Sequence, residues 1–193
     1  MNRIAAMVRE TDLTPYVDLH LPAPWTEDMI GSVAGREHKI REMASRVGAV
    51  ILGGAAPIWA YLAGLRCALL ANTNARIFFF DPKQQERLVE IPARHQAGEF
   101  PPGLVELEWN VQPALAELRL KLISTDKFLP PSAAQALANA PWYGAIPKCD
   151  SIGLYGPGPT WLYATYARWL MNSGVRRLSS WDARQRTHIT IWE

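Results

Sequence analysis

Short apolar runs separated by turn residues recur along this chain in an order typical of an α/β fold. Residues 16–21 alternate apolar and polar positions, which predicts a β-strand. Residues 48–52 and 151–155 are continuous apolar runs of strand length, so we expect them near the centre of a sheet. Further strands are predicted at residues 76–80, 104–110 and 175–181.

Helices are expected after both central runs. Residues 57–70 and 159–171 are apolar and follow Gly/Pro turns, and proline suits the first helical position because its φ angle is fixed. Asparagine and glycine residues at 72–74 and 172–174 end these two helices. Two further helix starts are predicted, at Thr26 and at the capping box of residues 130–135.

One segment of about 17 residues occurs twice. Residues 52–68 and 154–170 match at a constant offset, and the shared Pro-x-Trp-x-Tyr-x4-Arg spacing is improbable by chance. The strand ends that follow, FFFDPKQ and SSWDARQ, also correspond. The identical pairs are Leu52/Leu154, Gly54/Gly156, Pro57/Pro159, Trp59/Trp161, Tyr61/Tyr163 and Arg66/Arg168.

The repeat predicts a duplicated module. Each copy runs from strand through Gly-turn and helix to strand, a parallel crossover of Rossmann-like type, and the antiparallel-looking terminal strands make each sheet mixed. We therefore expect two tandem Rossmann-like mixed-sheet units that form an intramolecular pseudo-dimer. The first unit is assigned to residues 1–112 and the second to residues 113–193, with the link near residues 111–117.

Composition narrows the class of protein. The chain has 193 residues, 49% of them hydrophobic and 20% charged, which excludes a disordered chain. No apolar run is long enough to cross a membrane, and the first residues do not resemble a cleavable signal peptide. Two cysteines, Cys67 and Cys149, form no disulfide framework, so we expect buried thiols in a cytoplasmic protein.

Charge is unevenly distributed. The formal net charge is +2, yet residues 118–193 carry nine Lys/Arg against four acidic residues. The second half therefore suits either an anionic partner or an ordinary solvated basic face. The excess is too small to predict binding of long duplex DNA.

The turns before the two repeated helices are candidate ligand sites. Their small residues allow close backbone approach, and the free N–H groups at a helix start favour an anion such as phosphate. Tight strand-to-helix packing explains the same residues equally well. The candidate ligand-binding residues in these turns are Gly53, Gly54, Ala55, Ala56, Tyr155, Gly156, Pro157 and Gly158.

A second candidate lies at the ends of the following strands, in Asp81-Pro82-Lys83 and Asp182-Ala183-Arg184. A carboxylate two residues before a cation can orient a ribose hydroxyl and bind a phosphate. A surface turn is the alternative. Because both features occur twice in matching places, we favour the functional interpretation.

The repeated helices carry further candidates. Trp59 and Arg66 are seven residues apart and share a helix face, as do their counterparts in the second copy. We expect the tryptophans in the core and the arginines on a solvated or ion-paired face. Tyr61 and Tyr163 point away from that face, where they either stack on a base or line a subunit contact.

Histidine adds no candidate. The spacing of His20, His38, His95 and His188 matches no metal signature, and none of the four recurs between the copies. We expect structural or surface roles for them. The sequence reveals no Ser-His-Asp or Cys-His arrangement.

The motifs LGGAAPIW and RIFFFDPK resemble the small CRISPR-associated ring nucleases of type III systems. In that family a strand, a Gly-rich turn, a Pro-Ile-Trp helix start and an Asp-Pro-Arg strand end occur in this order. The resemblance covers about residues 16–110 and again 118–193. It implies a CARF-related fold, and the family's dimeric state agrees with the duplication.

The resemblance also implies an activity. Family members bind cyclic tetra-adenylate, an antiviral second messenger, and cleave it to linear products by attack of a ribose 2′-hydroxyl, in some cases with manganese. The implied assembly here is a homodimer of pseudo-dimers. By motif match, the implied catalytic residues are Asp81, Lys83, Asp182 and Arg184.

Two departures from the family keep alternatives open. Gly53 and Ala55 in one copy, and Tyr155 and Pro157 in the other, replace a family serine and arginine. The family histidine before the Asp strand is missing. We therefore expect a ring nuclease; the alternatives are a non-catalytic sensor or sponge and a structural subunit of a CRISPR effector. Asp81→Ala and Asp182→Ala are expected to have unequal effects.

Overall fold

The computed structural model describes residues 15–21, 30–81, 88–93, 105–123 and 146–193, and it confirms a mixed α/β protein with two mixed sheets. Strands of the first half form a four-stranded sheet, and those of the second half form a five-stranded sheet. The first sheet contains β1 (Tyr16–Asp18), β2 (Ala49–Gly53), β3 (Arg76–Phe80) and β4 (Leu88–Ile91). The second contains β5 (Val105–Val111), β6 (Ala116–Leu122), β7 (Ser151–Tyr155), β8 (Arg177–Asp182) and β9 (Thr187–Trp192).

Four strands of each sheet follow one plan. In the first sheet β1, β2 and β3 are parallel and β4 is antiparallel to β3; in the second, β6, β7 and β8 are parallel and β9 is antiparallel to β8. Strand β5 extends the second sheet alone, antiparallel to β6. The two halves therefore share strand order and direction over the region in which the sequence repeats.

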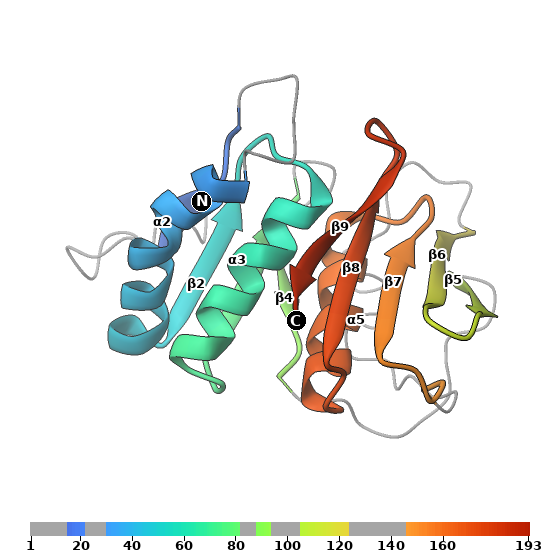
Figure 1. Cartoon of the computed structure of the whole chain (residues 1–193). Helices are drawn as coiled ribbons and strands as arrows, with labels where there is room; N and C mark the ends of the chain where they lie inside the picture. The colour runs from blue at the N-terminus through green and yellow to red at the C-terminus, as the bar shows by residue number, and fades with distance from the viewer. Residues whose placement is uncertain (1–14, 22–29, 82–87, 94–104, 124–145) are drawn as a thin grey trace.

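Three α-helices and one π-helical turn occur in the described residues. Helix α2 (Ile30–Glu42) continues into the π-helical turn Met43–Val47, which ends at Gly48 with a left-handed φ of 71°. Helices α3 (Ile58–Ala71) and α5 (Thr160–Asn172) follow β2 and β7. The two sheets are covered on opposite sides, because α2 and α3 lie in front of the first sheet and α5 lies behind the second (Figure 1).

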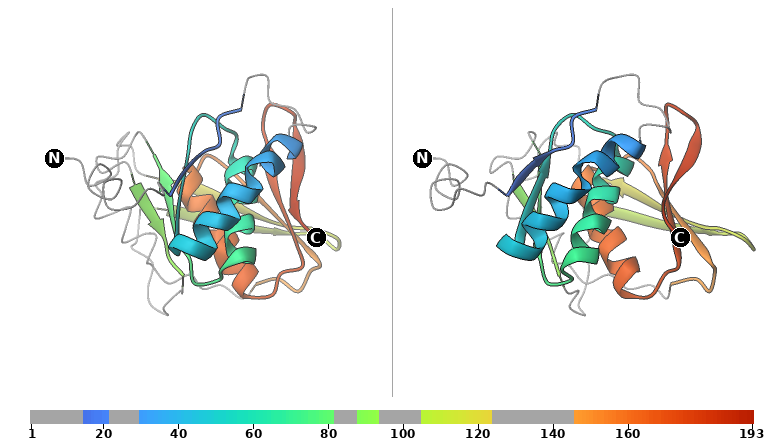
Figure 2. Two further views of the ribbon diagram at one scale, coloured as in Figure 1. Left: turned by 90° about the vertical axis from the view of Figure 1, so that its left-hand side faces the viewer. Right: turned by 60° about the vertical axis from the view of Figure 1, so that its left-hand side comes forward.

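The side-by-side helices α3 and α5 lie between the two sheets, as the rotated views show (Figure 2). Helix α3 packs on β2 of its own sheet and also contacts β8 and β9, while α5 contacts β4 of the other half. Both helices are therefore apolar around most of their circumference, as expected for helices buried on several sides. Trp59 and Trp161 are 2% and 0% exposed, so the prediction that they lie in the core is confirmed.

Several predicted elements shift by a few residues. Pairing in β1 stops at Asp18, although Leu19 still donates its backbone N–H to the last residue of β2, and Leu21 donates to Ala55 after that strand. Pro57 and Pro159 cap the helices instead of starting them, with ψ angles of 159° and 154°. Strands β4 and β9 were not predicted: β4 has only four residues, and β9, with six, begins with the polar Thr187 and His188.

The region predicted as the link between units forms a hairpin. Residues 111–117 join β5 to β6 inside the second sheet, where Gln112 donates its backbone N–H to Leu115. Strand β5 therefore lies before the predicted boundary at 112/113, but it pairs with β6, which lies after that boundary. The boundary itself stays a prediction. The helix starts predicted at Thr26 and at residues 130–135 lie outside the described residues. Within the described chain, no helix is long and apolar enough to cross a membrane.

Candidate functional site

The two Gly-turns are built alike. Gly54 and Gly156 have φ angles of +101° and +113°, a region that favours glycine. A side chain at either position would also collide with its surroundings: with the Asp18 carboxylate at Gly54, and with the Leu120 carbonyl oxygen at 2.5 Å at Gly156. Both glycines are therefore required by the backbone path itself.

In each half, a tyrosine of the helix hydrogen-bonds to the turn that precedes that helix. The hydroxyl of Tyr61 donates to the carbonyl of Gly54, and that of Tyr163 donates to the carbonyl of Gly156, each at 2.5 Å. Both rings are buried, at 6% and 1% exposure. The repeated Tyr thus has a structural partner in both halves, and its predicted contact with a ligand stays a prediction.

Burial makes these phenols hard to ionise. Desolvation raises the pKa of Tyr61 to about 12, and nearby Tyr16, Asp18 and Asp81 add to the shift. Desolvation alone raises the pKa of Tyr163 further above its usual value. Tyr16 and Asp18 border the first Gly-turn, because a Cβ atom at Gly53 would meet the Tyr16 ring and one at Gly54 would meet the Asp18 carboxylate.

The end of β1 covers the first turn. Leu19 and Leu21 donate their backbone N–H groups to the carbonyls of Gly53 and Ala55, at 2.7 and 3.0 Å. Arg36 on α2 donates to the carbonyls of Asp18 and His20 and holds this segment from the other side. The carbonyl groups of Gly53 and Ala55 are therefore already hydrogen-bonded within the protein.

Asp182 is held by three donors. Its Oδ1 accepts the backbone N–H groups of Arg184 and Gln185 at 2.8 and 3.2 Å, which closes the turn between β8 and β9. Its Oδ2 accepts the indole N–H of Trp59 at 3.1 Å, a contact between the two halves. The carboxylate is 7% exposed, so it acts in this structure as a buried acceptor that joins the halves.

Asp81 has a more open setting at the end of β3. Its side chain is half-buried, and its charge contributes to the raised pKa of Tyr61. Lys83, its predicted partner, lies outside the described residues. Arg184, the corresponding cation in the second half, is exposed beside Asp182.

The strand ends of both halves approach the start of α3. Trp59 lies in its first turn and contacts Asp182, while Tyr61 two residues later is influenced by Asp81. The corresponding indole of Trp161 is fully buried, and its N–H has no hydrogen-bond partner among the described residues. The two halves are therefore similar in backbone and different in this contact.

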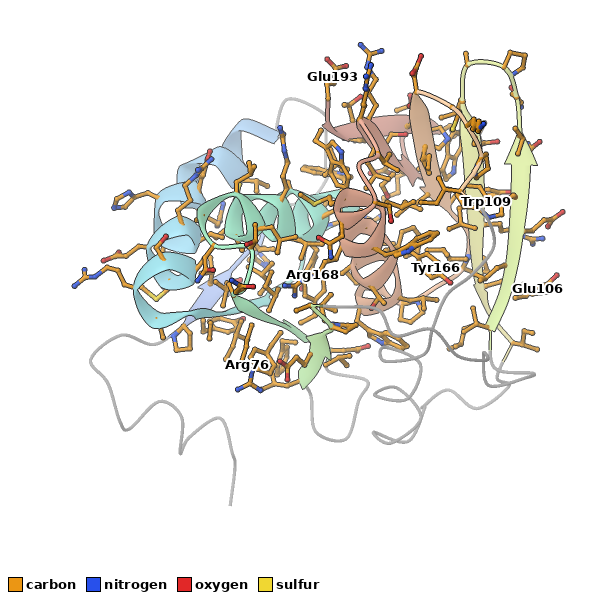
Figure 3. The ribbon with its side chains drawn as sticks, turned by 90° about the horizontal axis from the view of Figure 1, so that it is seen from below. Arg76, Glu106, Trp109, Tyr166, Arg168 and Glu193 are labelled. Atoms are coloured by element: carbon orange, nitrogen blue, oxygen red, sulfur yellow. The ribbon has the colours of Figure 1, made fainter. Side chains whose placement is uncertain are left out.

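Sequence patterns did not predict the role of the repeated arginines. Arg66 donates to the Ile191 carbonyl at 3.2 Å, and Arg168 donates to the Ile91 carbonyl at 2.9 Å, so each arginine binds the antiparallel edge strand of the other half. Arg168 also donates to the carbonyls of Thr73 and Ala75. It is 1% exposed and lies near the middle of the molecule (Figure 3). The sequence signal for this role was that an arginine occurs at the same position of both repeated segments.

Burial has an electrostatic cost for Arg168. Desolvation lowers its pKa to about 10, partly offset by the charge of Glu90, and the guanidinium stays protonated at neutral pH. The prediction of a solvated or ion-paired arginine face is therefore wrong for Arg168, which carbonyl dipoles stabilise.

The described residues do not fit a manganese ion. They contain no group of three or more His, Cys, Asp or Glu side chains arranged to hold a metal.

Comparison with models of known protein families finds no match, and comparison with curated proteins finds no similar sequence. The features that point to a function are therefore the repeat, the geometry of the strand ends and the resemblance of the motifs.

Proposed function

We propose that the protein binds a cyclic oligoadenylate, with cyclic tetra-adenylate favoured, and cleaves it as a duplicated ring nuclease that ends CRISPR type III signalling. In this proposal the two halves are Rossmann-like, CARF-related units that form an intramolecular pseudo-dimer. A pseudo-twofold protein suits a cyclic ligand because equivalent groups can contact equivalent nucleotides.

One observation carries the proposal. Each half places a positive-φ glycine turn and an aspartate at the carboxyl ends of neighbouring parallel strands, and the Trp59–Asp182 hydrogen bond brings the second strand end to the first helix. In open α/β sheets, ligands bind at this end of the strands. The repeated turn supports phosphate binding, since each turn precedes a helix N-terminus.

The proposed catalysis depends mainly on how the protein positions the reacting groups of the ligand. A ribose 2′-oxygen attacks the adjacent phosphorus, the 5′-oxygen leaves, and the ring opens with a terminal cyclic phosphate. In-line alignment supplies the main rate enhancement. Asp81 is suited to accept a hydrogen bond from the 2′-hydroxyl, because its side chain is half-exposed at the end of β3.

The test is incubation with labelled cyclic tetra-adenylate, with separation of cyclic and linear products by chromatography. We expect linear product from the wild type, loss of cleavage in Asp81→Ala with the fold retained, and a lower unfolding midpoint in Asp182→Ala. Intact ligand that does not bind would overturn the proposal. Light scattering with and without ligand tests the homodimer of pseudo-dimers.

A sensor or sponge is the second candidate function. It is favoured by the occupied Asp182 carboxylate, since a second catalytic carboxylate is then missing from the second half. Binding of the intact ring, measured by calorimetry without product formation, would support it over cleavage.

A further inference from the structure

A chain of three polar side chains crosses the face of the second sheet that is remote from α5. His188 on β9 has its Nε2 atom 2.9 Å from Glu117 Oε1 on β6, and its Nδ1 atom 3.3 Å from Ser179 Oγ on β8. This face points toward the viewer in Figure 1. The two hydrogen bonds join residues that are 71 and 9 positions apart in the sequence, so no sequence motif predicts this arrangement.

The direction of these hydrogen bonds follows from the chemistry of the groups. A carboxylate only accepts hydrogen bonds, so Nε2 of the neutral imidazole carries the proton and donates to Glu117. Nδ1 is then the basic nitrogen and accepts the proton of the Ser179 hydroxyl. The Ile152 carbonyl at 3.5 Å is a longer, competing acceptor for that hydroxyl. The order nucleophile, base and orienting carboxylate is that of an activated serine.

The sheet is shaped to hold the histidine ring. A Cβ atom at Gly153 on β7 would lie 2.6 Å from the His188 ring, so only glycine lets the ring cross the sheet to Glu117. The Trp181 ring packs edge-on against His188, with centroids 5.2 Å apart. Trp181 is itself 38% exposed and offers an aromatic surface next to the chain.

The first half lacks this arrangement. By strand register and the repeat offset, Glu117, Gly153, Ser179 and His188 correspond to Tyr16, Ile51, Phe78 and Leu88. Three of those four counterparts are apolar. The polar chain therefore does not belong to the shared architecture and needs an explanation specific to the second half.

We infer that Ser179, His188 and Glu117 form a second reactive site, in which Ser179 is a nucleophile toward esters carrying an aromatic group. His188 and Glu117 are 19% and 21% exposed and Ser179 is 7% exposed, so the site is shielded but opens to solvent. Trp181 supplies a stacking surface for the aromatic group. Arg177, exposed on the same face two residues before Ser179 and about 7 Å along the strand, supplies positive charge for the oxyanion.

The reaction balances without a cofactor. The Ser179 oxygen bonds to the acyl carbon while its proton passes to His188 Nδ1. The ester C–O bond then breaks, and the leaving alcohol takes that proton. Water attacks the acyl-serine, releases the carboxylic acid and restores the hydroxyl. This site is independent of cyclic oligoadenylate binding.

The test uses the full chain with a fluorophosphonate probe, which forms an Oγ–P bond at an activated serine with loss of fluoride. We expect label on Ser179, mapped by mass spectrometry, and hydrolysis of 4-nitrophenyl acetate. His188→Ala should lower the labelling rate by about 100-fold. Glu117→Gln, which keeps the shape of the side chain, should cause a smaller loss on the order of tenfold.

Ser180→Ala is the matched control, because Ser180 is the next residue on β8 and faces the buried side of the sheet. It should label like the wild type. Circular dichroism and unfolding midpoints verify that each variant is folded. No label on Ser179, or an equal rate in a folded His188→Ala or Glu117→Gln variant, would overturn the inference and leave the chain a purely structural bridge.

Discussion

The two halves of the molecule agree closely inside each turn and disagree where they meet. Both turns use a positive-φ glycine whose carbonyl accepts a buried tyrosine hydroxyl at 2.5 Å. At the junction, Trp59 donates to Asp182 whereas Trp161 has no hydrogen-bond partner among the described residues. Among the residues that the structure describes, Arg168 donates to three carbonyls and Arg66 to one.

This difference separates two kinds of constraint. A turn with one permitted backbone path tolerates little change, so both copies keep it. The contacts between the two halves must together be strong enough to hold the halves in place, but it does not matter which half provides a given contact. The second half therefore contributes the fully buried arginine, and the first half contributes the bonded tryptophan.

The largest expected effect tests the similarity of the turns. Gly54→Ala and Gly156→Ala each combine an unfavourable φ with a steric collision, so each should lower the free energy of unfolding by about 3 kcal/mol. Urea denaturation measures this. Gly35→Ala on α2, where an added Cβ meets nothing within 4 Å, is the control and should stabilise by about 1 kcal/mol. Very different losses at the two turns would contradict their equivalence.

The next effect tests the asymmetry of the arginines. Arg168→Met leaves three carbonyls without this donor and should cost about 3 kcal/mol. Arg66→Met removes from a half-buried site the one hydrogen bond that Arg66 makes within the described part of the chain, and should cost about 1 kcal/mol. Thermal unfolding of both variants measures the difference. Equal losses would show that the junction is energetically symmetric despite its geometry.

A smaller effect is expected for the tryptophans. Trp59→Phe leaves Asp182 Oδ2 without its indole donor and should cost about 2 kcal/mol. Trp161→Phe removes an N–H that has no partner among the described residues, so no hydrogen bond is lost. The free energy of unfolding should fall by only about 1 kcal/mol, because the smaller ring packs less well. A double-mutant cycle between Trp59→Phe and Asp182→Asn measures the bond directly. A coupling energy near zero would remove this difference between the halves.

The smallest effect appears only in alkali. The pKa of Tyr61 is raised to about 12, so the folded state binds more protons than the unfolded state above pH 10. The resulting stability is complete below pH 10 and is lost as the pH rises through 12. Absorbance titration at alkaline pH, compared with Tyr61→Phe, should show one fewer late-ionising phenol in the variant. An unchanged titration would mean that Tyr61 is solvated.

Much of the fold follows from local sequence. The runs at residues 48–52 and 151–155 predicted β2 and β7, because central parallel strands are apolar on both faces. Strand β5 was predicted at residues 104–110, but the turn that joins it to β6 was mistaken for a link between units, because only the strand register shows that β5 pairs within the second sheet. Cross-strand pairs such as Glu106–Lys121 and Glu108–Arg119 stabilise that outer face, and such pairs become visible only once the register is known.

The candidate site was harder to predict for the same reason. Asp182 looked like a free strand-end carboxylate because its partner Trp59 lies 123 residues earlier in the chain. Arg168 looked solvated because its acceptors are main-chain atoms, which have no sequence signature. Ser179 and His188 look unremarkable until β8 and β9 are paired.

The arginines at the junction have an evolutionary consequence. They bind main-chain carbonyls of the opposite edge strands, so no substitution of Ile91 or Ile191 other than one that moves the backbone removes an acceptor. The side chains of those strands can therefore drift without separating the halves. One half can therefore change the side chains of its edge strand while its contact with the arginine of the other half is preserved.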